Sequence, residues 1–351
     1  MALRVTVVGV GLVGEAIVSC FKERSFPCEW PPRIAATHER PKHIAGEQMF
    51  VEETSPNVFK DADLVLFAGK EGARGASVTW RETAQKEGAI CIDNGRDFRL
   101  SDDVPLVVPE VNPHTLTQDA RFIASPNCST IQLVVALYPI HRAAGIRCIR
   151  IAGYQSTSGW GVRGPEELEK QVPVALQSLE NIPFDPAVFP YPIAFNCIPH
   201  IEPFLEDDYT REELKLVYET RKIMDAPELR VSATCVRVPV FVGHCQAVWI
   251  ETEKPISPEE VRNLLQQSPG VVLIDDVMPD NPRGDKNERS YPTTLDVNKY
   301  RDEVLVGRIR KDISDDNGIT LWCVADNLRK GAALNVVQIA EEMLRKGILR
   351  Q

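Results

Sequence analysis

The sequence predicts an α/β protein that begins with a doubly wound parallel sheet and continues into a second, α+β domain. Two observations lead to this prediction. In the first part of the chain, short apolar strands alternate with helical segments, and the first strand runs through a glycine turn directly into a helix. Beyond it, longer strands follow with fewer helices between them, at residues 146–155, 231–238, 245–251 and 271–274.

Composition argues against several classes of function. The 351 residues carry 40 basic and 50 acidic side chains, a net charge of −10, so nucleic acid and anionic membranes are poor candidate partners. The nine cysteines are odd in number and form no CxxC pair, which argues against a disulfide framework and a zinc site. No segment approaches the roughly 20 apolar residues that cross a bilayer, and no cleavage site follows the apolar start. We expect a cytoplasmic protein without a metal ion.

The first strand, residues 3–8, leads into Gly9-Val10-Gly11-Leu12-Val13-Gly14 and a helix over 15–23. This order is typical of a dinucleotide-binding turn. The first glycine allows the tight turn, the second lets the backbone approach a pyrophosphate, and the third lets the helix pack on the strand. We therefore expect a Rossmann-type domain in which the cofactor contacts are Gly9, Gly11, Leu12, Val13 and Gly14.

The second strand, residues 33–37, is predicted to end where the adenosine ribose of such a cofactor lies. An acidic residue there favours NAD, whereas basic and hydroxyl side chains favour the 2′-phosphate of NADP. Thr37, Arg40 and Lys42 favour NADP, while Glu39 favours NAD, and a solvated charged loop would look the same. We expect NADP, bound through Thr37 and Arg40.

The first domain is completed by predicted strands at 64–67, 89–92 and 121–124 and a helix near 76–87. After Ser125-Pro126-Asn127, an apolar helix is predicted to begin at Cys128 and to reach residue 144. Asn127 is a good N-cap, so Cys128 is expected in the first turn, where free backbone N–H groups stabilise a thiolate. A buried, inert cysteine is the alternative. We expect residues 1–127 with 331–351 to form the NADP-binding domain and residues 128–330 the catalytic and dimerisation domain.

The second domain contains several further predicted elements, and its sheet is expected to form a dimer interface. These elements are a helix at 165–179, a proline-rich surface passage at 182–203, a helix at 258–267, an exposed loop at 279–294, a strand at 318–325 and a turn at 326–331. After this turn, a helix at 332–346 is predicted to pack back on the first domain.

Three polar side chains of this domain stand out, each with a less specific alternative. Gln155 ends a strand, where an amide can position a reacting group, although turns often contain glutamine. Glu219 and Lys222 are three positions apart on one helical face, so they offer a site an anion and a cation or form an ordinary i, i+3 ion pair.

Arg237 and His244 form a further candidate pair. Strict strand alternation would place them on opposite faces, so Pro239 or Gly243 must break the strand if both serve one site. In that case Arg237 can hold a carboxylate and His244 can act as acid and base near neutral pH. The alternatives are a surface arginine and a buried, hydrogen-bonded histidine.

Taken together, these segments resemble the aspartate-semialdehyde dehydrogenases of the bacterial type, over nearly the whole chain. The order and spacing of the matching words make the resemblance specific. They are PLVVPEVNP at 105–113, SPNCSTIQ at 125–132, YQSTSGWG at 154–161, ETRKIM at 219–224, VSATCVRVPVFVGH at 231–244 and DNLRKGAALN at 326–335.

The resemblance implies an NADPH-dependent reductive dephosphorylation of L-4-aspartyl phosphate to L-aspartate 4-semialdehyde, the precursor of lysine, threonine and methionine, by a homodimer or homotetramer. It implies that Cys128 is the nucleophile, that Gln155 orients the acyl-enzyme and that His244 is the general acid/base. The other implied contacts are Arg237 for the substrate carboxylate, Glu219 for its amino group, Arg99 and Lys222 for phosphate, Asn127 for substrate, and Ser158, Gly159 and Asn327 for the cofactor.

The chain departs from the family pattern in four places. Its glycine turn is one residue shorter than G-A-T-G-x-V-G, the segment 69–75 is charged, Gly95-Arg96-Asp97 replaces small hydroxyl residues before Arg99, and Cys245 replaces a common serine. Two other functions remain open: a related acyl-phosphate reductase, such as one acting on N-acetylglutamyl phosphate, and a non-catalytic dinucleotide-binding paralogue. Glu219 would favour a free amino group, since an acylated amine offers a carboxylate no cation.

Overall fold

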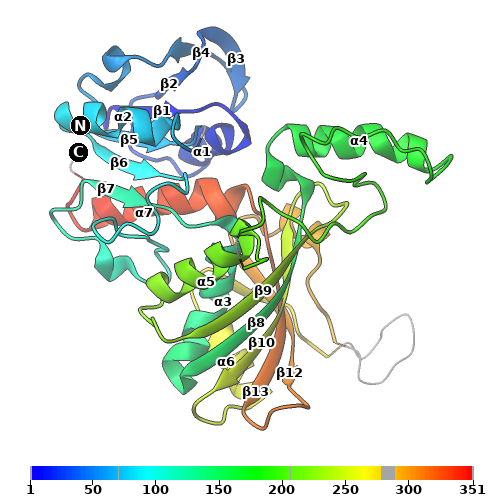
Figure 1. The fold of residues 1–351 in the computed structure, drawn as a ribbon. Coiled ribbons are helices and arrows are strands. Elements are labelled where there is room, and N and C mark those ends of the chain that lie inside the picture. The colour runs from blue at the N-terminus through cyan, green and yellow to red at the C-terminus, as the bar shows by residue number, and fades with distance from the viewer. Residues whose placement is uncertain (1, 70, 206, 278–288, 350–351) are drawn as a thin grey trace. The chain divides into compact units, whose positions relative to one another are not determined.

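The computed structural model describes residues 2–69, 71–205, 207–277 and 289–349. The chain divides into two compact units, residues 1–127 with 331–351, and residues 128–330. Each unit is built around one sheet with helices beside it (Figure 1). The exposed loop predicted at 279–294 lies outside the described residues up to position 288.

The first unit contains a seven-stranded sheet in the order β3-β4-β2-β1-β5-β6-β7. Every neighbouring pair is parallel except β3 and β4, which confirms the predicted parallel α/β sheet. The strands are β1 (Val5–Val8), β2 (Arg33–Ala36), β3 (Arg40–Ile44), β4 (Glu47–Glu53), β5 (Leu64–Phe67), β6 (Ile90–Asp93) and β7 (Phe122–Ala124).

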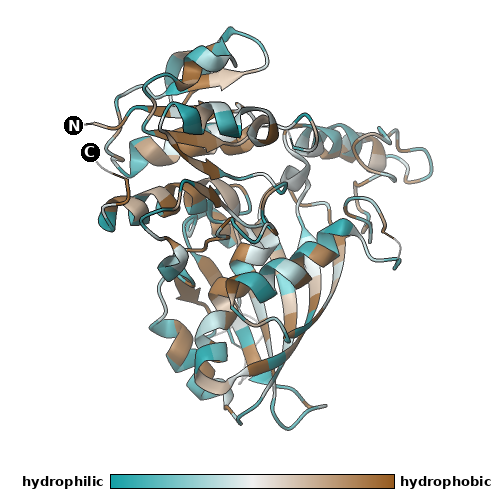
Figure 2. Cartoon of the chain, turned by 60° about the vertical axis from the view of Figure 1, so that its left-hand side comes forward, coloured by the Kyte–Doolittle hydropathy of each residue, from teal (hydrophilic) through white to brown (hydrophobic). Residues whose placement is uncertain are grey.

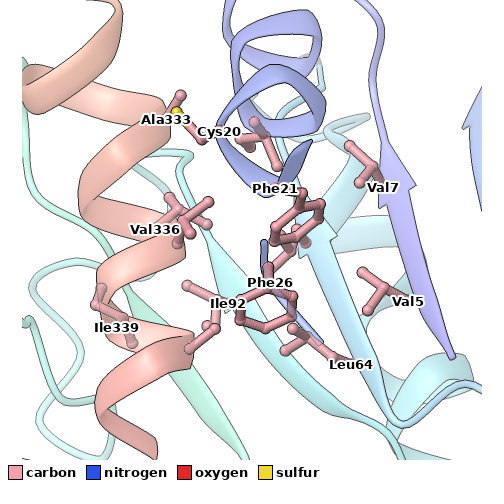
Figure 3. Packing of buried hydrophobic residues seen from close by; sticks show 14 of the residues in the cluster. Val5, Val7, Cys20, Phe21, Phe26, Leu64, Ile92, Ala333, Val336 and Ile339 are labelled. Atoms are coloured by element: carbon pink, nitrogen blue, oxygen red, sulfur yellow. The ribbon is translucent and has the colours of Figure 1, made fainter. Parts of the chain in front are cut away.

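Helices cover both faces of this sheet. On one face, α1 (Leu12–Glu23) and α7 (Leu334–Arg345) share a buried apolar cluster with the strands, so the last helix of the chain packs on the first domain as predicted. Figure 3 shows the Phe21 and Phe26 rings, whose centroids lie 4.6 Å apart, between the strands and α7. Burying each such ring contributes roughly 2–3 kcal/mol before the entropic cost of folding. On the other face, α2 (Ala76–Lys86) lies over β5 and β6.

The second unit contains a six-stranded mixed sheet in the order β11-β12-β13-β10-β8-β9. One face is covered by α3 (Cys128–Ala144), α5 (Arg211–Ile223) and α6 (Pro258–Gln266) (Figure 1). The strands are β8 (Ile146–Gln155), β9 (Arg230–Arg237), β10 (His244–Thr252), β11 (Val271–Leu273), β12 (Val304–Lys311) and β13 (Gly318–Ala325). Helices α5 and α6 carry apolar residues on one side and polar residues on the other, as packing on a sheet requires, whereas residues 129–137 of α3 are all buried (Figure 2).

Helix α5 is fixed at both its beginning and its sheet contact. Thr210 and Glu213 form a reciprocal capping box, which satisfies two backbone donors at the start of the helix. A second oxygen of the Glu213 carboxylate accepts the backbone N–H of Cys235 on β9 at 3.0 Å. The first turn of α5 is therefore tied directly to the edge strand of the sheet.

Several predictions of local structure are wrong in informative ways. The charged segment around Arg40 is not a loop but β3, a polar edge strand whose alternation is too weak to identify from sequence. Strand β12 was not predicted at all. The passage 182–203 is not only a surface segment, because its apolar residues Val188, Phe189 and Ile193 pack against α4 (Arg163–Ala175), which itself ends before the predicted residue 179. The turn predicted at 326–331 continues into a π-helical turn, Arg329–Ala333.

Candidate active site

Cys128 is the first residue of α3, as the sequence predicts, and it is half-buried. The first turn of this helix is anchored to the sheet, because the side-chain amide of Gln246 donates to the carbonyl of Ser129 at 3.0 Å. Free backbone N–H groups at a helix start stabilise a negative charge nearby. Cys128 therefore lies where the sequence predicts a stabilised thiolate, and this stabilisation stays a prediction.

Three strand ends of the second unit bring the other predicted catalytic residues together. Gln155 is the last residue of β8, and it lies opposite Arg237, the last residue of β9. On the other side of β8 lies β10, which begins at His244. The segment between Arg237 and His244 leaves the sheet, and Gly243 has a φ of +97°, so the predicted strand break is confirmed.

His244 is held as a neutral imidazole with its proton on Nε2. The backbone N–H of Ser156 donates to Nδ1 at 3.0 Å, so Nδ1 must be the acceptor and Nε2 carries the proton. Complete burial, assisted by the positive charge of Arg237, lowers the pKa of His244 to about 3. Nε2 is buried and has no hydrogen-bond partner among the described residues, so it is a donor available for a bound molecule.

This tautomer is secured by a buried hub at Asn327. Its side-chain oxygen accepts hydrogen bonds from the hydroxyls of Ser156 and Ser158 at 3.0 and 3.1 Å and from the backbone N–H of Gly243 at 2.9 Å. The hub therefore fixes the residues on both sides of His244. Contact of Ser158 and Asn327 with the cofactor stays a prediction.

Arg237 carries the positive charge of the site. Its guanidinium is buried and donates to the carbonyl of Ser156 at 2.6 Å. Burial lowers the pKa of Arg237, while the negative charges of Glu212 and Cys128 act on it in the opposite direction. A guanidinium in this setting stays protonated and can hold a carboxylate with two parallel hydrogen bonds.

Gly159 borders the space between Arg237 and His244. A Cβ built on Gly159 would lie 2.7 Å from Nη1 of Arg237 and 3.3 Å from Nε2 of His244. Any side chain here would therefore fill the space toward which both polar groups are directed. The predicted cofactor contact of Gly159 is not tested by this geometry.

Sequence reasoning missed the carboxylate that contacts Gln155. The side-chain amide of Gln155 donates to Glu212 on α5 at 2.8 Å, and the ammonium of Lys215 donates to the other oxygen of Glu212 at 3.1 Å. Burial alone would raise the pKa of Glu212, but Lys215, Gln155 and Arg237 together lower it to about 2. Glu212 is therefore ionised at neutral pH.

Glu212 and Lys215 have the same i, i+3 spacing as the predicted pair Glu219 and Lys222, and they precede that pair on the same helix. The spacing was therefore a usable signal, but it did not say which pair faces the site. Glu219 is buried and Lys222 half-buried further along α5, and their roles toward substrate stay predictions.

The first unit contains a cavity of about 710 Å³ beyond the carboxyl ends of β1, β2 and β5. Its lining includes Gly9, Val10 and Gly11 of the glycine turn, the predicted residues Thr37 and Arg40, and Arg74, which sequence reasoning did not single out. Leu12, Val13 and Gly14, which were also predicted as cofactor contacts, begin α1 and are not among the lining residues.

The packing of the turn glycines agrees with a dinucleotide-binding turn, and their contact with the cofactor stays a prediction. Gly9 has a φ of +113°, and a Cβ on it would lie 2.5 Å from the carbonyl oxygen of Ala68. A Cβ on Gly14 would lie 2.0 Å from the carbonyl oxygen of Gly9, whereas a Cβ on Gly11 would extend into open space, where a pyrophosphate can approach. The shorter turn therefore keeps the close packing and the open approach that dinucleotide binding needs.

Basic side chains around this cavity have different tasks. Lys42 donates to Glu15 at 2.6 Å and to the carbonyl of Val10 at 2.7 Å, so it stabilises the glycine turn. Arg40 and Arg74 line the cavity, and Glu39, which argued against NADP, does not. The lining also includes the carboxylate of Glu53.

Two departures from the family pattern contact each other in the first unit. The backbone N–H of Gly72, in the charged segment 69–75, donates to Asp97 at 2.9 Å, and Glu71 pairs with Arg96 at 3.5 Å.

Arg99, the predicted phosphate ligand, is buried and donates to the carbonyls of Asn94 and Gly95 at 2.8 and 3.1 Å. Asn127 directly precedes α3.

The low pKa of His244 predicts a pH-dependent stability. Between its ordinary pKa of 6.5 and its folded value of about 3, the unfolded chain binds a proton that the folded chain excludes. Lowering the pH through this window should therefore destabilise the wild type, relative to His244→Asn, by up to about 1.4 kcal/mol per pH unit. Denaturant unfolding at several pH values gives the free energy of unfolding of each protein. An equal dependence of this free energy on pH in the two proteins would contradict the prediction.

The described residues contain no group of His, Cys, Asp and Glu arranged to hold a metal ion, and none of their helices is long and apolar enough to cross a membrane. The nine cysteines, all of which belong to described parts of the chain, are free thiols.

Comparisons with known proteins agree with this geometry. The model of the semialdehyde dehydrogenase NAD binding domain matches residues 4–119, and that of the semialdehyde dehydrogenase dimerisation domain matches residues 137–330. An aspartate-semialdehyde dehydrogenase from Aquifex aeolicus is 43% identical over 355 residues, which cover 99% of this chain and 100% of the relative.

Two solved structures from Vibrio cholerae are also similar over nearly the whole chain. The crystal structure of aspartate semialdehyde dehydrogenase II has a TM-score of 0.88 and 41% identity, covering 98% of this chain and 99% of the other. A structure of that enzyme complexed with ASA has a TM-score of 0.88 and 40% identity, with the same coverage.

Proposed function

Because the chain belongs to the aspartate-semialdehyde dehydrogenase family, we propose that it reduces L-4-aspartyl phosphate to L-aspartate 4-semialdehyde with NADPH. It is an oxidoreductase with a domain that binds a nicotinamide dinucleotide. The observation that carries the proposal is the arrangement in the second unit, where three strand ends bring Gln155, Arg237 and His244 together and Cys128 begins α3.

The reaction begins at Cys128. Its thiolate attacks the acyl carbon, a C–S bond forms, the C–O bond to phosphate breaks, and phosphate leaves and takes up a proton. The resulting thioester holds the substrate on α3. Arg237 binds the substrate carboxylate, and Gln155 orients the acyl group through an amide fixed by Glu212.

A nicotinamide cofactor held at Gly9 and Gly11 of the glycine turn would supply a hydride to the acyl carbon. The negative charge that develops on the acyl oxygen is stabilised by the Nε2–H of His244, which is directed into the site and buried. The tetrahedral species on Cys128 then collapses, its C–S bond breaks, and the aldehyde and the thiolate are restored. His244 thus acts first as a hydrogen-bond donor, and its predicted role as general acid/base requires the proton to leave Nε2.

Glu219 on α5 stays the proposed partner of the substrate ammonium. Glu212, on the same helix, is ionised, buried and bonded to Gln155, so a second carboxylate charge lies beside the residue that orients the acyl group. A free amino group would gain an ion pair with Glu219, whereas an N-acetylated substrate would not. This discrimination favours aspartyl over N-acetylglutamyl substrates.

NADP is proposed over NAD because Thr37, Arg40 and Arg74 line the cavity at the end of β2.

We propose that the protein forms homodimers or homotetramers through the second unit, which matches a dimerisation domain. On its sheet, β8, β9 and β10 line a further cavity of about 600 Å³ that includes Arg150, Ser232 and Trp249.

Activity of the purified protein tests the proposed function. In the reverse direction it should reduce NADP only when aspartate semialdehyde and phosphate are both present, and more efficiently than it reduces NAD. Activity confined to N-acetylglutamate semialdehyde would replace the proposed substrate. Absence of activity with either aldehyde, together with retained NADP binding, would favour a non-catalytic dinucleotide-binding paralogue.

A further inference from the structure

Gln246 is a buried side chain that takes no part in the bond changes of the proposed reaction. It lies on β10 two positions beyond His244, so the two side chains project from the same face of the strand, roughly 7 Å apart. A buried amide has to satisfy its donors and its acceptor inside the protein. The partners of Gln246 therefore show what the residue holds in place.

Both ends of the Gln246 amide are bonded. Nε2 donates to the carbonyl of Ser129, in the first turn of α3, at 3.0 Å, and Oε1 accepts from the thiol of Cys323 on β13 at 3.3 Å. The opposite orientation of the amide would place its oxygen against the carbonyl oxygen of Ser129, where neither atom can donate. The donor of this amide is therefore committed to the turn of the helix that begins at Cys128.

Cys323 extends this contact into a closed loop of hydrogen bonds. Burial raises the pKa of Cys323 well above its ordinary value, so the thiol keeps its proton and donates it to Gln246. The amide of Gln132, also on α3, donates to the sulfur of Cys323 at 4.0 Å. Each group thus donates to the next, from α3 through β13 and β10 back to α3. Hydrogen bonds aligned in one direction strengthen one another.

This loop fixes the start of α3 against β10. Its members belong to the second unit, as do Cys128 and His244. Cys128 directly precedes Ser129, and His244 is the first residue of β10. One side chain, Gln246, therefore connects the turn of the nucleophile with the strand end that carries the Nε2–H donor. Reaction at one acyl carbon requires the sulfur and this donor in a fixed relative position.

We propose that Gln246 is a positioning residue, which holds the first turn of α3 so that the sulfur of Cys128 and the Nε2–H of His244 meet at the same acyl group. The inference rests on the proposed function, because it assigns Gln246 a task in the thioester reaction. Gln246 acts through Ser129 and needs no contact with substrate.

The variant Gln246→Met removes the donor and keeps the length of the side chain. Its kcat should fall about 100-fold, while KM for aspartate semialdehyde changes less than about threefold, because the reacting groups are misaligned and substrate binding is retained. This loss should be the same at every pH, since methionine does not titrate. Steady-state kinetics at several pH values measures both constants.

The variant Gln246→Glu makes the same hydrogen bond depend on pH. A protonated carboxyl can donate to the carbonyl of Ser129 and accept from Cys323, whereas a carboxylate cannot donate. Burial should raise the pKa of the introduced carboxyl above its usual value of about 4.3. The kcat of this variant, divided by that of the wild type at the same pH, should therefore fall as the pH rises through that pKa and recover when the pH is lowered. A role in stability alone predicts no such recovery.

Gln171→Met is the matched control. Gln171 is a buried glutamine of the same unit whose amide is also bonded at both ends, to Glu167 at 2.8 Å and to the N–H of Ile193 at 2.7 Å. It lies on α4, and these bonds connect α4 with the passage 182–203. Its replacement should lower the temperature of thermal unfolding and leave kcat within about threefold of the wild type.

The thiol of Cys323 provides a second test if Gln246→Met does not fold. Cys323→Ala removes the donor that orients the Gln246 amide, so kcat should fall about fivefold. Cys323→Ser keeps a donor at this position and should stay within about twofold of the wild type. Equal activity of the two Cys323 variants would contradict the role of the loop.

Three further results would overturn the inference. They are a wild-type kcat in folded Gln246→Met, a loss in Gln171→Met as large as that in Gln246→Met, and a loss in Gln246→Glu that does not recover at low pH. Failure of the proposed function gives a different result, because it removes wild-type activity on aspartate semialdehyde. Hydrogen exchange of residues 129–137 needs no substrate. It should be faster in Gln246→Met than in the wild type and in Gln171→Met if Gln246 holds α3.

Discussion

The variant Cys128→Ser should lose activity with aspartate semialdehyde by about 10⁴-fold or more in kcat/KM. A serine hydroxyl at the start of α3 stays protonated at neutral pH, because the helix N-terminus and Arg237 can ionise a thiol but not an alcohol. His244 cannot compensate as a base, since its Nε2 already carries a proton and its Nδ1 is occupied by the N–H of Ser156. The initial rate of NADP reduction in the presence of phosphate measures the loss.

Cys197→Ser is the control for this variant, because Cys197 is an exposed free thiol. It should retain wild-type activity and wild-type thermal unfolding. Both variants should bind NADP as the wild type does, because the dinucleotide cavity is formed by the first unit. Activity of Cys128→Ser within tenfold of the wild type would mean that the thioester is not on the reaction path.

The parts of the site that follow from local signals could be predicted from sequence. Pro126 and Asn127 before an apolar run indicate a helix start, and the structure begins α3 at Cys128. Likewise, Gly9, Gly11 and Gly14 occur between a strand and a helix, and each has the packing that its position predicts. In both cases the chemistry depends on residues that are neighbours along the chain.

The parts that depend on register over longer distances could not be predicted. Glu212 and Glu219 stand on the same helix with equal claims from spacing, and only the contact between α5 and β8 identifies Glu212 as the partner of Gln155.

The protonation of His244 is another property that the residue type alone predicts poorly. A histidine near neutral pH suggests an acid/base, but complete burial and the charge of Arg237 hold the ring neutral, and the Ser156 N–H and the Asn327 hub define one tautomer. Ser156, Arg237 and Asn327 are far apart in the sequence and lie at or just beyond the ends of β8, β9 and β13. The fold therefore assigns His244 the task of a hydrogen-bond donor in the resting enzyme.

Replacing Gly159 by alanine tests whether the space between Arg237 and His244 is the place where the substrate reacts. The added methyl group would lie 2.7 Å from Nη1 of Arg237 and 3.3 Å from Nε2 of His244. Because misplacing reacting groups by about 1 Å can cost about 100-fold in rate, kcat/KM should fall by roughly that factor. Steady-state kinetics measures the fall, and circular dichroism and thermal unfolding should show that the fold is retained.

Gly153→Ala is the matched control, because Gly153 lies on β8, the strand that ends at Gln155. A Cβ there would make ordinary contacts of 3.7 Å with Cys235 and Thr234. It adds the same methyl group to the strand that leads toward the turn containing Gly159, without entering the space between the two polar side chains, so its kcat/KM should stay within about threefold of the wild type. Similar losses in both variants would show that sheet packing, rather than occupation of the substrate space, explains the effect of Gly159→Ala. A selective loss in Gly159→Ala would place the reacting carbon between Arg237 and His244.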